Sequence, residues 1–117
     1  MNKDYKIEMK PTYWEVTLER GAYSDGEEEH LYFRANSQEE VWHFLKRYLN
    51  DIWNREDWNC IGAVILTDAK GNTIDKYATE GYKKKSEEND WEIDYDSEYG
   101  NAWGVTINRL NVIYFNK

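Results

Sequence analysis

The chain has 117 residues, a net charge of −8 and a hydrophobic share of 40%. This length predicts one domain built around one core. Six Trp, ten Tyr and three Phe exclude an intrinsically disordered chain, while the acidic balance argues against nucleic acid or an anionic membrane as partner and favours a basic one.

The cellular compartment is indicated by cysteine usage and by the absence of targeting patterns. Cys60 is the one cysteine, which excludes an intrachain disulfide and is typical of a reducing compartment. No stretch approaches the roughly 20 apolar residues that cross a bilayer, and residues 1–16 lack the apolar core of a signal peptide. We therefore expect a cytoplasmic protein. Cys60 opens the apolar run 60–66 and is expected to be a small buried hydrophobe.

The N-terminal part predicts a β-hairpin. Residues 13–19 alternate between apolar and polar side chains, with Trp14, Val16 and Leu18 on one face. Residues 29–35 alternate in the same way, and glycines in the intervening segment mark a loop. The pattern is that of two half-buried strands, and His30 falls on the outward face of the second.

A helix is expected over about residues 38–53. Ser37 and Glu40 have the spacing of a capping box, and the residues after them repeat at helical spacing. The apolar stripe comprises Val41, Phe44, Leu45, Tyr48, Leu49 and Ile52, with Trp42 and Trp53 beside it.

The second half begins with a short apolar run, 60–67, which predicts a central strand buried on both faces. Residues 68–72 read as a hairpin turn with Gly71 at positive φ, and residues 73–79 as the returning strand. Another strand follows from Trp103. Its inward register is interrupted by Arg109, so we expect a bulge or turn near Asn108.

These elements predict an α+β fold. One amphipathic helix packs across a four- to five-stranded, mostly antiparallel sheet, in the order ββαββ(β). The order of elements resembles that of a β-grasp fold. A fold of this kind does not by itself indicate a function.

No pattern of catalytic or cofactor-binding residues is present. His30 and His43 both fall on polar faces, outside any known nucleophile or metalloprotease motif, and no nucleotide-binding glycine motif occurs. A glycosidase would need two carboxylates set across a cleft, which clustered solvated acids do not provide. We therefore predict a non-catalytic protein without a cofactor.

The acidic segment 86–99 is the most unusual feature of the sequence. Seven of the 23 acidic residues lie here without any Lys or Arg, so nearly all of the excess charge is local. Acidic and apolar or aromatic side chains alternate, which predicts an extended chain with carboxylates along one side. Lys83, Lys84 and Lys85 precede it; they are too few for a nucleic-acid footprint and are expected to offset neighbouring acids.

Three interpretations of this segment compete. The first is a charged edge strand or loop that deters edge-to-edge pairing. The second is a calcium-binding module, although counting an EF-hand loop from Asp94 puts Tyr99 at the glycine position and Val105 at the bidentate glutamate position. In the third, the row of carboxylates imitates the phosphates of a nucleic acid, whose spacing is of the same order. A separate alternative for the whole chain is a structural or adaptor domain that associates through an exposed edge strand.

We take the third interpretation as the prediction and keep the others as alternatives. The chain would then be an inhibitor, monomeric or dimeric, that occupies the nucleic-acid site of a basic nuclease or effector complex and does not bind nucleic acid itself. In size and acidity alone it resembles the inhibitors that phages and mobile elements make against restriction or CRISPR nucleases. The predicted partner-binding residues are Glu87, Glu88, Asp90, Trp91, Glu92, Asp94, Tyr95, Asp96, Glu98 and Tyr99.

Overall fold

The computed structural model describes residues 12–20, 28–55, 61–96 and 102–111. In this part of the chain the elements are β1 (Thr12–Glu19), β2 (Glu28–Ala35), α1 (Gln38–Arg55), β3 (Ala63–Thr67), β4 (Thr73–Ala78), α2 (Glu80–Glu88) and β5 (Trp103–Arg109). The α+β class and the order of elements are as predicted, except that α2 was not expected. Cys60 lies outside the described residues.

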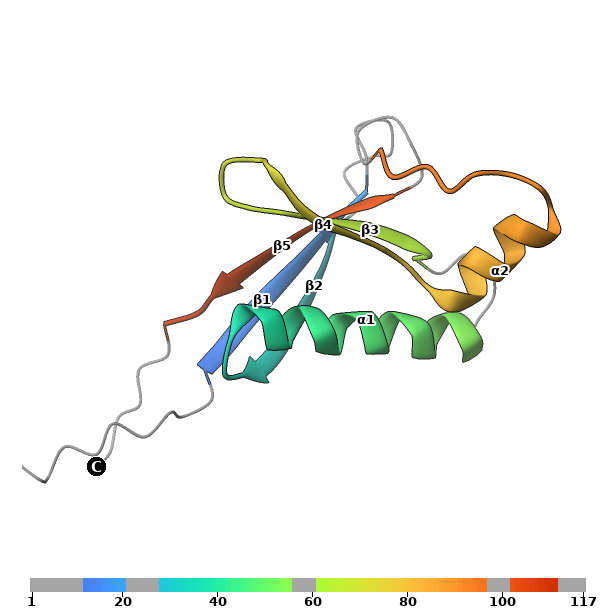
Figure 1. Ribbon diagram of the computed structural model, residues 1–117. Helices are drawn as coiled ribbons and strands as arrows, with labels where there is room; N and C mark the ends of the chain where they lie inside the picture. The colour runs from blue at the N-terminus through green and yellow to red at the C-terminus, as the bar shows by residue number, and fades with distance from the viewer. Residues whose placement is uncertain (1–11, 21–27, 56–60, 97–101, 112–117) are drawn as a thin grey trace, which may run out of the picture.

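The five strands form one mixed sheet in the order β2-β1-β5-β3-β4. Two antiparallel hairpins, β1–β2 and β3–β4, are joined by β5, which runs antiparallel to β1 and parallel to β3. β5 therefore lies in the middle of the sheet although it comes last in sequence. Figure 1 shows the sheet with α1 along one of its faces and α2 beyond the end of β4.

The predicted bulge near Asn108 is wrong. β1 and β5 pair in continuous register from Glu19 opposite Gly104 to Trp14 opposite Arg109. Arg109 is exposed, whereas Val105 is fully buried. Arg109 stays on the face of Val105 and Ile107 and is exposed because it lies at the end of the strand, so no irregularity is needed.

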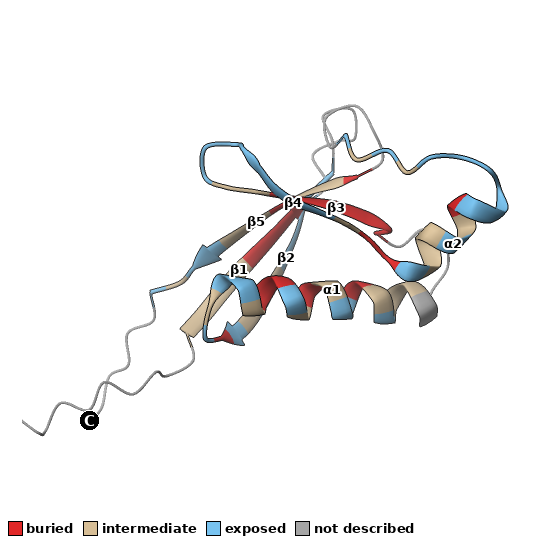
Figure 2. Ribbon diagram, in the orientation of Figure 1, coloured by how far each residue is buried: buried red, intermediate tan, exposed pale blue. Residues whose placement is uncertain are grey.

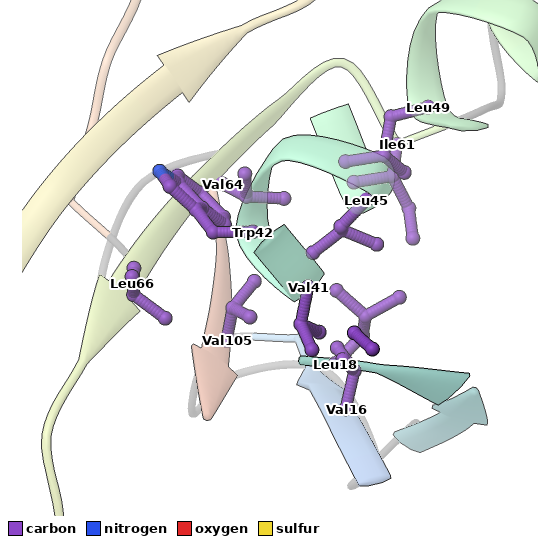
Figure 3. Close-up of a cluster of buried hydrophobic side chains, with 11 residues drawn as sticks. Val16, Leu18, Val41, Trp42, Leu45, Leu49, Ile61, Val64, Leu66 and Val105 are labelled. Carbon is purple, nitrogen blue, oxygen red and sulfur yellow. The ribbon is translucent and has the colours of Figure 1, made fainter. Parts of the chain in front are cut away.

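The main core lies between α1 and the sheet. Val16 and Leu18 of β1, Val64 of β3 and Val105 of β5 face Val41, Leu45 and Leu49 of α1, as Figure 3 shows. Figure 2 shows the same division, with buried residues on the central strands and on one side of α1. Burial of this apolar stripe explains why α1 is stable in its place.

The start of α1 is fixed by the predicted cap. The Glu40 amide donates to Ser37 Oγ at 3.2 Å, and the Asn36 amide donates to Glu40 Oε1 at 3.3 Å. The predicted apolar stripe is correct except at Tyr48, which is 40% exposed, and Trp42, placed beside the stripe, is buried. The buried side of α1 therefore includes Trp42 and not Tyr48. The indole N–H of Trp42 has a polar partner on β4.

That partner is Asp75, whose Oδ2 accepts a hydrogen bond from Trp42 Nε1 at 2.8 Å. This bond, followed by that from the Lys76 amide, lowers the pKa of Asp75. Lys46 Nζ lies 5.5 Å from the Trp42 ring centroid and 5.7 Å from that of Tyr77. Polar and cation–π contacts thus attach β4, the edge strand next to β3, to α1.

Asp75→Ala is expected to lower the free energy of unfolding by about 1–2 kcal/mol, because a buried indole N–H loses its acceptor. Since the folded state lowers the pKa of Asp75, its stabilising effect is present above the unfolded pKa and is lost as the pH falls through the folded one. The difference from wild type should be constant above about pH 5 and shrink below about pH 4. Urea unfolding at several pH values measures it.

Asp75→Asn is the matched control for this prediction. Its amide carbonyl still accepts from Trp42, so a smaller loss without the acid dependence is expected. An Asp75→Ala variant as stable as wild type at neutral pH would contradict the assigned role of the bond.

Candidate functional site

The acidic segment follows α2, and α2 is positioned by its own N-cap. Thr79 is fully buried, its amide donates to the Gly62 carbonyl at 2.8 Å, and its Oγ1 accepts from the Tyr82 amide at 3.3 Å. Glu80 in the first turn and Lys85 in the last turn both suit the helix dipole. The chain therefore passes directly from β4 into a helix.

Two close approaches at glycines hold α2 against the rest of the fold. The indole of Trp53, on α1, occupies the space where a Cβ at Gly81 would lie, and the Tyr82 ring does the same at Gly62, before β3. The Trp53 and Tyr82 rings meet edge to face with centroids 5.3 Å apart. Only glycine permits this packing distance.

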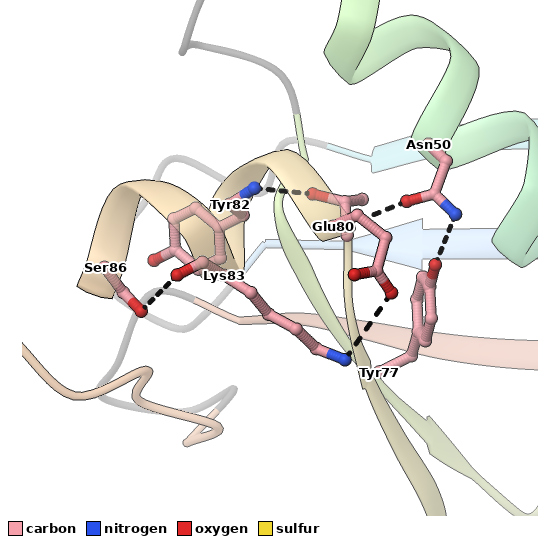
Figure 4. Close-up of polar contacts among 7 residues, drawn as sticks. Asn50, Tyr77, Glu80, Tyr82, Lys83 and Ser86 are labelled. Carbon is pink, nitrogen blue, oxygen red and sulfur yellow. Dashed lines mark hydrogen bonds and ion pairs between the residues drawn. The ribbon is translucent and has the colours of Figure 1, made fainter. Parts of the chain in front are cut away.

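A polar contact between the helices adds to this packing. Asn50 of α1 donates from Nδ2 to the Tyr77 hydroxyl, and its Oδ1 accepts from the Glu80 amide at 3.0 Å (Figure 4). Burial raises the pKa of Tyr77, with which Lys83 Nζ makes a ring contact at 5.9 Å. One amide side chain thereby links α1, β4 and α2.

The three lysines lie on α2, and one of them has a defined acidic partner. Lys83 Nζ lies 3.8 Å from Glu80 Oε1, one turn earlier on the same helix and outside the acidic segment. Lys84 is exposed, and Lys85 is half-buried and has an interaction of its own. The prediction concerned the acids of the segment that follows the lysines, whereas Glu80 precedes them, so this ion pair does not test it.

The predicted extended chain from Glu88 onward is wrong in its first part. Glu87 and Glu88 belong to α2, and Asp90 lies in a turn at φ 55°. The turn is closed by the Trp91 amide, which donates to the Ser86 carbonyl at 3.1 Å. Asn89 caps the helix by donating from Nδ2 to the Lys85 carbonyl at 2.8 Å. These local bonds stabilise helix and turn over the extended chain.

Residues 91–96, here called the strap, cross the sheet face opposite α1. They have no regular secondary structure, yet their burial alternates from Glu92 to Asp96. Ile93 and Tyr95 pack against a second cluster formed by Ala63, Ile65, Ala78 and Ala102. The small alanine side chains leave room for the two larger ones. Within the described part of the acidic segment, the predicted alternation is thus present in the strap alone.

The exposed side of the strap carries the carboxylates of Glu92, Asp94 and Asp96. Asp94 Oδ1 accepts from the Asp96 amide at 2.9 Å, which fixes the local bend. Lys76 Nζ lies over the Tyr95 ring, 5.7 Å from its centroid, so a cation–π contact adds to the packing of this tyrosine. Tyr82 of α2 packs against the same cluster as Ile93 and Tyr95, which places the strap beside α2. Burial raises the pKa of Tyr82, and the nearby Asp94 carboxylate raises it further.

The end of α2 and the strap together form one acidic surface. All its carboxylates are exposed: Glu87, Glu88, Asp90, Glu92, Asp94 and Asp96. Within the described ranges, no Lys or Arg forms an ion pair with Glu87, Glu88 or Glu92. Trp91 is 39% exposed and packs against Tyr82, with ring centroids 5.2 Å apart and ring planes tilted by 58°. Glu98 and Tyr99, also predicted here, lie outside the described residues.

A second polar group lies on the same sheet face, over β1 and β2. His30 Nδ1 lies 3.4 Å from Glu15 Oε2 and its Nε2 lies 3.1 Å from Glu28 Oε1. Tyr32 donates to Glu15 Oε2 at 2.9 Å, a bond that raises the pKa of this tyrosine. His43 is exposed on α1. In the part of the chain described, no three His, Cys, Asp or Glu side chains are grouped to hold a metal ion.

No helix in the described ranges is long and apolar enough to cross a membrane. The chain matches no protein-family model, no curated protein and no solved structure. Functional interpretation therefore depends on the surface chemistry just described.

Proposed function

We propose that this chain is a small, non-catalytic cytoplasmic binding protein whose acidic surface occupies the nucleic-acid site of a basic partner. The observation that carries the proposal is the strap. Its anchors, Ile93 and Tyr95, are held against the sheet, while its carboxylates point to solvent. The negative charge is thereby presented on a fixed support.

A fixed support matters because binding otherwise costs conformational entropy. A free acidic loop would have to be ordered on the partner, whereas the strap is already held at alternate residues. In an extended chain, alternate side chains lie ~6.6–6.8 Å apart. A nucleic-acid strand carries one phosphate per ~3.4 Å of axis, and the distance between phosphates along the backbone is longer because the backbone spirals around that axis. Lys and Arg placed to follow a phosphate backbone would find comparable spacing at Glu92, Asp94 and Asp96.

The mimic would be more curved than the straight row of alternating carboxylates that the sequence suggests. Three carboxylates continue along the strap, and Glu87, Glu88 and Asp90 extend the charge around the end of α2. Trp91 lies between the two parts and is the exposed aromatic anchor of the surface. A tryptophan within a charged rim is a residue type that dominates interface energetics, and it stacks well on arginine.

The partner class is a nuclease or effector complex with a lysine- and arginine-lined groove, and the chain would be an anti-restriction or anti-CRISPR type inhibitor from a phage or mobile element. Complementary charge would speed association and make it sensitive to salt. Tyr95, half-buried beneath Lys76, would hold the strap rather than contact the partner.

The test is inhibition of DNA cleavage by a panel of restriction and CRISPR nucleases. The variant Glu87→Lys/Glu88→Lys/Glu92→Lys changes three side chains without ion pairs in the described ranges. It should fold normally and lose inhibition by roughly 100-fold, as expected when interfacial charges are reversed. Inhibition by wild type should also weaken steeply with salt.

The matched control is Glu19→Lys/Glu29→Lys/Glu39→Lys, which changes net charge equally at exposed positions on β1, β2 and α1. It should retain inhibition, so that position and not total charge is tested. Full potency of the first variant, or equal loss in both, would refute the proposal.

A further inference from the structure

The outer edge of β2 is open. β2 pairs with β1 on one side and, within the described part of the chain, has no strand on the other. It has eight residues, longer than the other edge strand, β4. Alternate amides and carbonyls of such an edge face outward and form a template for another strand.

The side chains of β2 differ between its two faces. Leu31 and Phe33 pack on the core beneath α1, whereas Glu28, His30, Tyr32 and Arg34 lie on the opposite face. Tyr32 is 66% exposed, the highest value among the large hydrophobic side chains described. Glu28 and Arg34, which carry opposite charges, lie at the two ends of this row of polar side chains.

We infer that β2 pairs antiparallel with β2 of a second copy, about a two-fold axis through Leu31. A two-fold axis perpendicular to the sheet keeps each residue on its own face. Residues paired across the axis must therefore be both odd-numbered or both even-numbered, because faces alternate along a strand. The axis at Leu31 sets Glu28 opposite Arg34 of the second copy, twice by symmetry. It also sets His30 opposite Tyr32, so the row is complementary to itself.

Neighbouring registers lack this complementarity. An axis at Tyr32 sets Arg34 opposite His30, and an axis at His30 sets Glu28 opposite Tyr32 and leaves Arg34 beyond the paired strand. Opposite charges facing each other across strands stabilise pairing, while like charges weaken it. Glu28 is 41% exposed and contacts His30 from one carboxylate oxygen, Oε1. The Glu28 side chain therefore remains accessible to an arginine.

The other sheet edge, β4, is less suited to this role. It is shorter, and its register with β3 shifts between Leu66 and Thr67. Asp75 and Tyr77 are bonded to side chains of α1. Asp75 and Lys76 are adjacent in sequence, so no two-fold register sets them opposite each other. The β2 edge lies across the sheet from β4, outside the acidic surface, and pairing there does not depend on the proposed inhibition.

Sedimentation equilibrium of the purified chain should show a reversible dimer. Arg34→Glu sets like charges opposite each other at both ends and should weaken the dimer by roughly tenfold or more. Glu28→Arg should do the same. Combining both changes restores opposite charges and should restore the dimer. The two side chains lie about 20 Å apart within one strand, so the rescue can only occur between copies.

Lys70→Glu, in the exposed β3–β4 turn, is the control with the same change of charge as Arg34→Glu and should leave the dimer unchanged. Circular dichroism checks that each variant is folded. A wild-type chain that stays monomeric up to millimolar concentration would overturn the inference. So would a dimer that Arg34→Glu leaves intact, or one that the combined variant does not restore.

Discussion

Gly81→Ala is expected to lower the free energy of unfolding by about 2–3 kcal/mol, the cost of overpacking a close contact. A Cβ at this position would overlap the Trp53 indole, so either α2 or the indole must move. Because Tyr82 packs on both Trp53 and Trp91, the displacement should reach the strap. Urea unfolding measures the loss, and hydrogen exchange of residues 80–96 measures the loosening.

Gly104→Ala is the control for this substitution. The Cβ there would meet only the Glu19 carbonyl oxygen at 3.7 Å, an ordinary contact, so a change within about 0.5 kcal/mol is expected. Equal effects of the two alanines would show that α2 is not held by the Gly81 approach.

Leu45→Ala is expected to cost about 3–4 kcal/mol, because a fully buried side chain is replaced by a cavity. Leu45 lies at the centre of the contact between α1 and the strands (Figure 3). A loss of this size is a large share of the free energy of unfolding of a small domain. The variant should therefore remain folded only if the wild-type free energy of unfolding exceeds the loss. Chemical unfolding followed by circular dichroism gives the value.

Tyr48→Ala, three residues along the same helix, is the matched comparison. The sequence places Leu45 and Tyr48 on one apolar stripe, but Tyr48 is exposed and should cost no more than about 1 kcal/mol when truncated. If the two substitutions cost the same, α1 would have to be rotated relative to the arrangement described here.

Several segments of the fold were predictable because their local signals are unambiguous. Val16 and Leu18 alternate as strand residues do, and Ser37 with Glu40 marks the start of α1 before any packing is considered. Gly71, at φ 85°, is in the left-handed region that the turn prediction required. In these segments local preference and tertiary packing agree.

The second helix was missed because it has no apolar period. Of its residues Ser86 alone is buried, and that side chain is satisfied by the Lys83 carbonyl at 2.8 Å. α2 is held instead by the Thr79 cap and by contacts at glycines, which a periodicity search does not detect. Thr79 followed by Glu80, with Lys85 in the last turn and Asn89 after it, was the available signal.

Only part of the acidic segment was predictable from its alternation. Alternating charges suggested one extended row, but alternation in sequence sets burial only where a partner surface exists. Ile93 and Tyr95 have such a surface, formed by Ala63, Ala78 and Ala102, and the alternation is present there. Glu88 and Asp90 are exposed, and the chain there forms the end of α2 and a turn instead.

The central place of β5 has a consequence for how this protein reaches its native state. Without β5 the two hairpins share no strand pairing in the described part of the chain, so the sheet cannot assemble until β5 has inserted between them. Val16 meets Ile107 only after nearly the whole described chain has been brought together. Closing so long a loop is entropically costly and slow, so we expect the insertion of β5 between the two hairpins to limit the rate of folding.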